Sequence, residues 1–176
     1  MNHTPGLTRK PVSPDTFKAL MSEFPSGVSV VTTTDEDGRP WGMTCSALCS
    51  LSIEPPTLMV CLRADSPTLA AVLRSGRFVA NLLHGDGQDV ARLFGSGSSR
   101  GERFKSVTWT AGPAGPHLSA DTHAIADCRV TRTVDGGTHL IVLGEVFDVT
   151  RRDGKPPLLY GRRRFHTLPH DTTPTR

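Results

Sequence analysis

The chain has 176 residues, of which 36% are hydrophobic and 21% are charged, which is the ordinary balance of a single globular domain. Its formal net charge of +3 is too small to indicate a nucleic-acid-binding protein and suits a protein that handles small anions. The 17 glycines and 14 prolines indicate many turns, so they favour a β-rich fold and disfavour a helix bundle.

The first elements predicted along the chain are a flexible arm and a helix. Residues 1–12 have no hydrophobic period and are expected to form the arm. Ser13 has the position of an N-cap and Pro14 that of the first helical residue, and together they predict where the helix begins. Four apolar residues follow at helical spacing and are expected to face a core: Phe17, Leu20, Met21 and Phe24.

A hairpin and a second helix are predicted next. Residues 28–34 and 41–51 have the composition of two strands joined by a turn at Asp37-Gly38. A buried strand at 57–62 precedes a helix that begins after Ser66 and ends at Gly76, a residue suited to the left-handed conformation of a helix end. One face of this helix is expected to be apolar and carries Leu69, Val72 and Leu73.

The remaining elements predict a single mainly β domain over residues 13–168. Neighbouring strands are joined by tight turns, which favours an antiparallel, closed Greek-key barrel with helices plugging its ends. A Rossmann domain is disfavoured because no GxGxxG motif follows a strand. In chain order the elements are a strand (78–83), a short helix (90–94), a Gly/Ser-rich loop (95–101), a turn-rich stretch (109–118), two long strands (124–134 and 139–150), a short strand (158–160) and a flexible tail (169–176).

The four cysteines, Cys45, Cys49, Cys61 and Cys128, form no CxxC pair and have no Cys/His spacing typical of zinc. We therefore expect reduced thiols, no metal site and a cytoplasmic location. The N-terminus lacks the apolar core of a signal peptide. The apolar run 58–62 is too short to cross a bilayer, so no membrane association is expected.

The segment Gly42–Ser52 is crowded with small hydroxyl and thiol side chains and has few of the large residues that pack a core. Small side chains let a flat ligand approach the backbone, whose N–H and C=O groups can meet the polar edge of a heterocycle. A barrel strand that bends sharply needs small residues as well. The composition alone leaves both interpretations open.

Three other positions have a binding interpretation and a structural one. Ser66 and Thr68 begin a helix, where free N–H groups and hydroxyls suit a phosphate, although Ser66 is also an ordinary cap. His139 follows a Gly-Gly turn, where it either borders a ligand or is an exposed turn residue. Tyr160 lies in a stretch, 151–164, with six basic residues and one acid, which either holds a dinucleotide phosphate or is solvated surface. No Ser/His/Asp order or Walker loop indicates hydrolysis or phosphoryl transfer.

Taken in order, several short motifs resemble the short-chain flavin reductase family, the reductase partners of two-component flavin-dependent monooxygenases. The resemblance covers roughly residues 17–165. Its carriers are FPSGVSVVT at 24–32, GMT at 42–44 with Ser46, Ser50 and Ser52 ahead of Pro55-Pro56, Ser66 with Thr68, GRF at 76–78 with Asn81, His139 with GEV at 144–146, Tyr160, and RF at 164–165.

The resemblance implies an FMN-binding split β-barrel with short flanking helices, a homodimer, and a flavin held near the subunit interface. It implies hydride transfer from NADH or NADPH to FMN or FAD, with the reduced flavin diffusing to a partner monooxygenase. His139 would lie at the nicotinamide side, although the acid of the family's frequent Gly-Asp-His is Thr138 here. The cofactor-binding residues would be Gly42, Met43, Thr44, Cys45, Ser46, Ser50, Leu51, Ser52, Ser66, Thr68, Arg103, Phe104 and Tyr160.

Three alternatives compete with a flavin reductase. The first is a non-catalytic flavin-binding protein with the same split barrel. The second is an oxidase of the pyridoxamine-phosphate type, for which the sequence offers no recognisable pyridoxal phosphate site. The third is a basic nucleic-acid binder, which the scarcity of aromatic residues beside the basic run disfavours.

Overall fold

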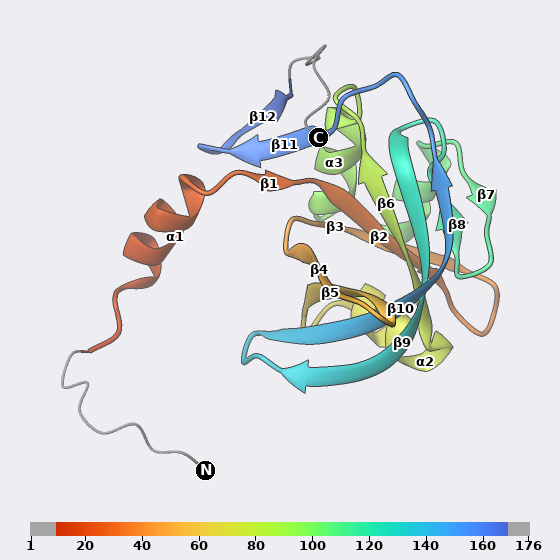
Figure 1. Cartoon of the computed structure of the whole chain (residues 1–176), viewed down its shortest axis with the longest axis horizontal. Coiled ribbons are helices and arrows are strands. Elements are labelled where there is room, and N and C mark those ends of the chain that lie inside the picture. The colour runs from red at the N-terminus through yellow and green to blue at the C-terminus, as the bar shows by residue number, and fades with distance from the viewer. Residues whose placement is uncertain (1–9, 169–176) are drawn as a thin grey trace.

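The computed structural model describes residues 10–168 and confirms a mainly β fold with short helices (Figure 1). The predicted tail 169–176 and most of the predicted arm lie outside the described residues. Within them, seven strands form one antiparallel sheet. Its spatial order is β3 (Pro40–Cys45), β2 (Ser29–Thr34), β6 (Arg77–Leu83), β9 (Thr122–Asp135), β10 (His139–Arg151), β5 (Pro56–Arg63) and β4 (Leu48–Ile53).

The sheet curls into a barrel that remains split. Strands β3 and β4 are its two edges, yet Ser46 and Ala47 alone separate them in the chain, so the edges must come together at this link. There the Cys61 N–H donates to the Ala47 carbonyl at 2.9 Å, and no strand ladder joins β3 to β4 among the described residues. The prediction of a closed barrel is therefore wrong, as is that of one continuous strand over 41–51.

Two further small sheets lie beside the barrel. The first has the order β1 (Ser26–Gly27), β11 (Leu158–Gly161) and β12 (Arg164–Thr167). The second pairs β7 (Thr110–Ala111) with β8 (Pro116–His117), inside the stretch predicted to be rich in turns. Of these strands, β11 and β12 form the hairpin that faces a helix across a cavity.

Helices cover the barrel at two places. Helix α2 (Pro67–Ser75) is capped by Ser66 and ends at Gly76 with φ 66°, as predicted. It buries Leu69 and Val72 in the main core, whereas Leu73 is exposed, against expectation. Helix α3 (Gln88–Gly95) packs on β2 and β3 and buries Phe94 in a second core. Helix α4 (Arg100–Lys105), which was not predicted from the sequence, follows it.

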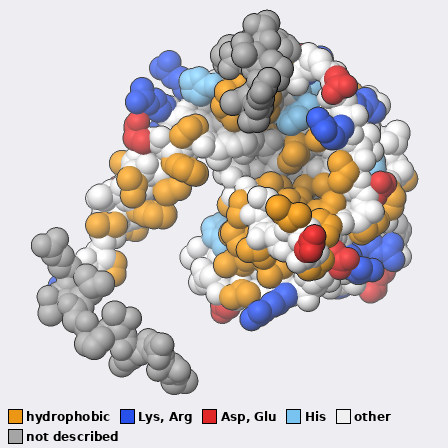
Figure 2. All heavy atoms as spheres, viewed as in Figure 1, with side chains coloured by type: hydrophobic (Ala, Val, Ile, Leu, Met, Phe, Trp, Pro, Cys, Tyr) orange, Lys and Arg blue, Asp and Glu red, His pale blue; other side chains and the backbone are white. Residues whose placement is uncertain are grey.

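Helix α1 (Pro14–Ser22) has the predicted Ser13 cap but not the predicted packing. It projects away from the barrel, and Figure 2 shows hydrophobic side chains exposed along it. The expectation that its apolar stripe faces the core of its own chain is wrong. The exposed fractions are 55% for Phe17, 66% for Leu20, 44% for Met21 and 67% for Phe24.

No helix within residues 10–168 has the length and apolar character needed to span a membrane.

Candidate functional site

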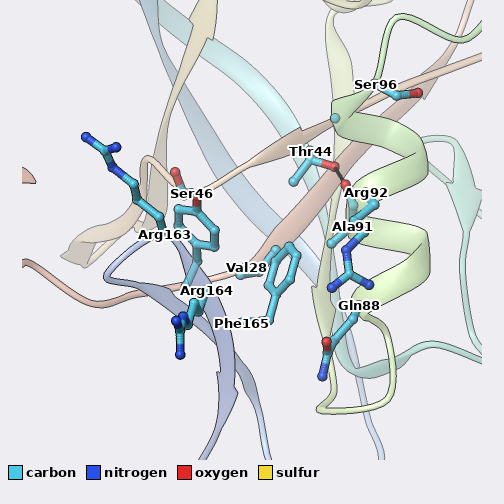
Figure 3. Close-up of a pocket in the computed structure, with 12 residues that line it drawn as sticks. Val28, Thr44, Ser46, Gln88, Ala91, Arg92, Ser96, Arg163, Arg164 and Phe165 are labelled. Atoms are coloured by element: carbon cyan, nitrogen blue, oxygen red, sulfur yellow. Dashed lines mark hydrogen bonds between the residues drawn. The ribbon is translucent and has the colours of Figure 1, made fainter. Parts of the chain in front are cut away.

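A cavity of about 640 Å³ lies between α3 and the β11–β12 hairpin (Figure 3). Thr44 and Ser46 line it from β3 and the link after this strand, and Figure 3 shows α3 and the hairpin facing each other across it. We call it the arginine-lined cavity because, among residues 10–168, three arginines and no carboxylate line it. The arginines are Arg92 from α3 and Arg163 and Arg164 from the hairpin.

A second cavity of about 1040 Å³ adjoins the first. It lies between α1, the link to β4, and β5, and we call it the apolar cavity because its lining includes Met21, Phe24, Leu48 and Met59. Both cavities are lined by Ser46, Tyr160 and Arg163, so they form one groove. Together they offer a space with an apolar part and a cationic part, joined at Tyr160.

The alternation of side chains along β3 fixes one wall of the groove. Met43 and Cys45 point into the main core, and because successive side chains of a strand alternate, Gly42 and Thr44 face α3. The Thr44 hydroxyl donates to the Ala91 carbonyl at 2.7 Å. A Cβ on Gly42 would lie 2.9 Å from a Phe94 ring carbon, so only glycine lets α3 approach this closely.

Arg103 is a cation held next to the arginine-lined cavity without a carboxylate partner among the described residues. Its guanidinium donates to the Gly42 carbonyl at 3.0 Å and to the carbonyl of Ser96, which lines the cavity. Its Nε is buried and has no hydrogen-bond partner within the part of the chain that the structure describes. Burial lowers the pKa of the Arg103 guanidinium, because desolvation penalises its charge. An uncompensated charge of this kind favours an anion nearby.

The turn of the β11–β12 hairpin is occupied by two arginines in the left-handed region. Arg162 has φ 49° and Arg163 has φ 61°, a conformation that costs a non-glycine residue roughly 1–2 kcal/mol. The hairpin register places Gly161 opposite Arg164, so Arg162 and Arg163 between them form a two-residue turn. Asn-Gly is the usual choice for such a turn. Arg162 is held by the Glu23 carboxylate at 3.0 Å and by the Ser22 carbonyl.

The residues predicted for the site fall into separate groups in the structure. Thr44, Ser46 and Tyr160 line the groove. Met43 and Ser66 contact each other, with the Ser66 hydroxyl donating to the Met43 sulfur at 3.4 Å. His139 begins β10 opposite Arg63 of β5, is exposed, and lines neither cavity. The structure therefore does not bring His139 to the groove of its own chain.

Other predicted residues are placed where their side chains serve the fold. Thr68 and Phe104 have exposed fractions of 4% and 7%, and the Phe104 ring packs edge-on against Phe94 at a centroid distance of 5.2 Å. Burial raises the pKa of the Cys45 thiol to about 11. Ser50, Leu51 and Ser52 lie on the edge strand β4, one side of which has no partner strand among the described residues. None of these residues lines either cavity.

Helix α3 contributes to the groove in a way that sequence reasoning missed. Gln88 and Arg92 line the arginine-lined cavity, and the Arg92 guanidinium lies 5.1 Å from the centroid of the Phe165 ring, an arrangement that Figure 3 shows. Asp89 also pairs with Arg92, at 3.0 Å. The polar face of this helix carried no motif, and only the contact with the distant hairpin makes it part of a site.

The fold and the groove define a class: a split-barrel protein with a groove that is apolar at one end and lined by arginines at the other. The chain belongs to the family described as flavin reductase like domain, whose model matches residues 21–169.

The chain is 48% identical over 150 residues to flavin reductase (NADPH) of Lentzea aerocolonigenes, covering 84% of this chain and 86% of that one. It is 43% identical over 173 residues to flavin reductase (NADH) of Kitasatospora aureofaciens, covering 97% and 87%. Among solved structures it resembles BorF, the flavin reductase component of a bacterial two-component tryptophan halogenase, with a TM-score of 0.83 and 29% identity over 90% of this chain and 100% of that one.

Proposed function

We propose that this protein is an NAD(P)H:flavin oxidoreductase that reduces FMN or FAD by hydride transfer and releases the reduced flavin to a partner monooxygenase. The groove carries this proposal: its apolar part suits the rings and its cationic part suits phosphate. The relatives named for NADH-dependent and NADPH-dependent flavin reduction support the activity, and BorF supports the two-component arrangement.

The residues present fit a flavin. We assign the flavin phosphate to Arg103, whose buried Nε has no hydrogen-bond partner among the described residues. Residues 46–49 line the apolar cavity and include the small side chains of Ser46, Ala47 and Cys49, which allow a planar ring system to approach the backbone. The unpaired side of β4 has backbone groups free to meet the polar edge of such a ring. We assign this contact to the backbone of the predicted residues Ser50, Leu51 and Ser52, which continue β4 beyond the part of it that lines the apolar cavity.

The protein's part in the reaction is to position its two substrates. A flavin held in the groove would supply the hydride acceptor, its N5, for the hydride on C4 of the nicotinamide, so the chain needs no nucleophile of its own. Thr44 is fixed by its bond to Ala91, which keeps the wall of the groove rigid. Tyr160 contacts Phe165 edge-on at a centroid distance of 5.2 Å, which orients its ring at the junction of the two cavities. Such fixed walls lower the entropic cost of bringing two rings together.

We further propose that the protein is a homodimer. Helix α1 has nine residues, is too short to be stable alone in water, and buries none of its side chains within its own chain. Its exposed stripe is a surface that a second copy of the chain would cover, and Ile53 of β4, exposed to 89%, is another apolar side chain open to a partner. In a dimer, His139 would border a nicotinamide in the groove of the other subunit, because it lies away from the groove of its own chain.

His139→Ala tests that assignment of His139. We expect the KM for NAD(P)H to rise or turnover to fall, by roughly 10-fold or more, while the affinity for flavin stays within twofold. Steady-state kinetics and flavin fluorescence titration measure the two effects separately. If the substitution abolishes flavin binding instead, the assignment of His139 to the nicotinamide side is wrong.

The four cysteines are free thiols in the structure, which supports a reducing compartment, and we propose the cytoplasm.

The function itself is tested by NADH and NADPH oxidation with added FMN, FAD and riboflavin, followed at the pyridine-nucleotide absorbance. Flavin-dependent oxidation is expected. Flavin binding without oxidation would identify a non-catalytic flavin-binding split-barrel protein, which is the alternative.

A further inference from the structure

The proposed function does not say which phosphate the arginines of the β11–β12 hairpin bind. Arg163 and Arg164 line the arginine-lined cavity, and no carboxylate of the described residues lies within ion-pair distance of either. Asp89 compensates the charge of Arg92, whereas the neighbouring charges of Arg163 and Arg164 repel each other unless an anion is present. The lining therefore suits a ligand with more than one negative charge.

The backbone conformation of the turn also indicates a ligand site. Arg163 keeps φ 61° where asparagine or glycine would be relaxed. Strained residues of this kind concentrate at ligand sites, where the surrounding structure holds them. Arg162, its neighbour in the turn, is fixed by Glu23 and the Ser22 carbonyl, so the position of Arg163 at the junction of the two cavities is set before any ligand arrives.

Arg92 of α3 and Phe165 of the hairpin form a stacking surface between the two walls. Arg92 is held over the Phe165 ring at 5.1 Å and by Asp89 at 3.0 Å. Guanidinium and aromatic planes are both surfaces on which an adenine ring stacks. The cavity volume of about 640 Å³ falls within the range of roughly 300–1,000 Å³ that is usual for small-molecule sites. Adenine, ribose and two phosphates are a group of suitable size and charge.

We infer that the arginine-lined cavity binds the adenosine diphosphate part of a dinucleotide, with Arg163 and Arg164 on the diphosphate and the Arg92–Phe165 pair beside the adenine. This inference rests on the proposed function, since that function supplies dinucleotides. Two of them carry the same chemistry: NAD(P)H and FAD. FMN has a single phosphate and no adenine, so it separates this site from the flavin phosphate contact assigned to Arg103.

The test uses Arg163→Asn with Arg164→Gln, because asparagine tolerates the left-handed turn and both changes remove charge. The matched control is Arg132→Gln, an exposed arginine of β9 that lines neither cavity. Calorimetric titration with ADP-ribose, which contains no nicotinamide, measures binding without any redox reaction. Thermal melting checks that each variant is folded.

We expect the double variant to bind ADP-ribose about 10- to 100-fold more weakly, as for loss of charge-assisted hydrogen bonds, while Arg132→Gln binds as the wild type does. The KM for NAD(P)H should rise by a similar factor with kcat and the KM for FMN unchanged. A rise in the KM for FAD, but not for NAD(P)H, would identify FAD as the source of the diphosphate.

Unchanged ADP-ribose affinity would overturn the inference, and so would an equal rise in the KM for FMN, which would mean that these arginines hold the flavin's own phosphate. If the double variant does not fold, Arg164→Gln alone is measured against the same control and criteria. If the protein binds ADP-ribose through these arginines but oxidises no NAD(P)H, the inference about this site holds and the proposed reductase function is wrong.

Discussion

Gly42 controls the distance between β3 and α3 and hence the shape of the groove. We expect Gly42→Ala to destabilise the protein by about 1–3 kcal/mol, because the new Cβ would lie 2.9 Å from Phe94 and 3.1 Å from Thr32. For a domain of this size the melting temperature should fall by roughly 2–12 °C. Gly95→Ala is the control, since its Cβ would meet Thr44 at an ordinary 3.7 Å. Equal melting temperatures for Gly42→Ala and the wild type would contradict this explanation of the wall.

Cys45 should make the fold sensitive to alkaline pH. Its pKa is raised from 9.0 to about 11 by burial, so the fold favours the neutral thiol. This contribution is complete below pH 9 and is lost as the pH rises through 11, amounting to about 2–3 kcal/mol. Denaturant unfolding at several pH values measures it. The decline between pH 9 and 11 should be shallower in Cys45→Ala and unchanged in Cys49→Ala, whose thiol is exposed; identical curves for all three proteins would refute the assignment.

At the residue scale, sequence reasoning located the site segment without resolving the roles within it. The small residues 42–52 indicated a ligand or a bend, and the structure shows a bend at Ser46 and Ala47 beside a groove. That Thr44 faces the groove while Cys45 is buried depends on which side of β3 meets α3. No local pattern contains that information, because the helix lies about fifty residues further along the chain.

At the element scale, local chemistry predicted helix and strand limits well and packing partners poorly. Ser13 and Ser66 cap helices as expected, and Gly76 ends α2. Helix α4 was missed, although Ser99 and Glu102 form a capping box, because its glycine and serine neighbours resemble a loop. The apolar stripe of α1 was recognised in the sequence. Hydrophobic spacing predicts that one face of a helix is buried, but it does not identify the surface that buries it.

That stripe gives a prediction about assembly. Phe17→Ser with Leu20→Ser should weaken self-association by at least roughly 100-fold, because each subunit loses two apolar side chains worth about 1.5–3 kcal/mol apiece when buried. Light scattering after size-exclusion chromatography measures the mass. Ala19→Ser, on the opposite side of α1, is the control and should remain dimeric. A wild-type protein that elutes as a monomer at micromolar concentration would disprove the homodimer.

At the scale of the whole molecule, the antiparallel β fold was predictable from turns and strand spacing, whereas the open barrel was not. Strands 41–45 and 48–51 look like one strand in the sequence, but they are opposite edges of the sheet. The groove lies at this split, where α1, the link 46–47 and the β11–β12 hairpin meet. These segments are far apart in the chain, so the site exists only once the sheet has curled.

The central claim is that this groove holds a flavin for reduction, and a crystal structure of the protein soaked with FMN or FAD tests it most directly. We predict density for the rings against residues 46–49 and Tyr160, with room for a nicotinamide above them. Flavin bound elsewhere, or a groove filled by side chains of a partner subunit, would contradict this claim.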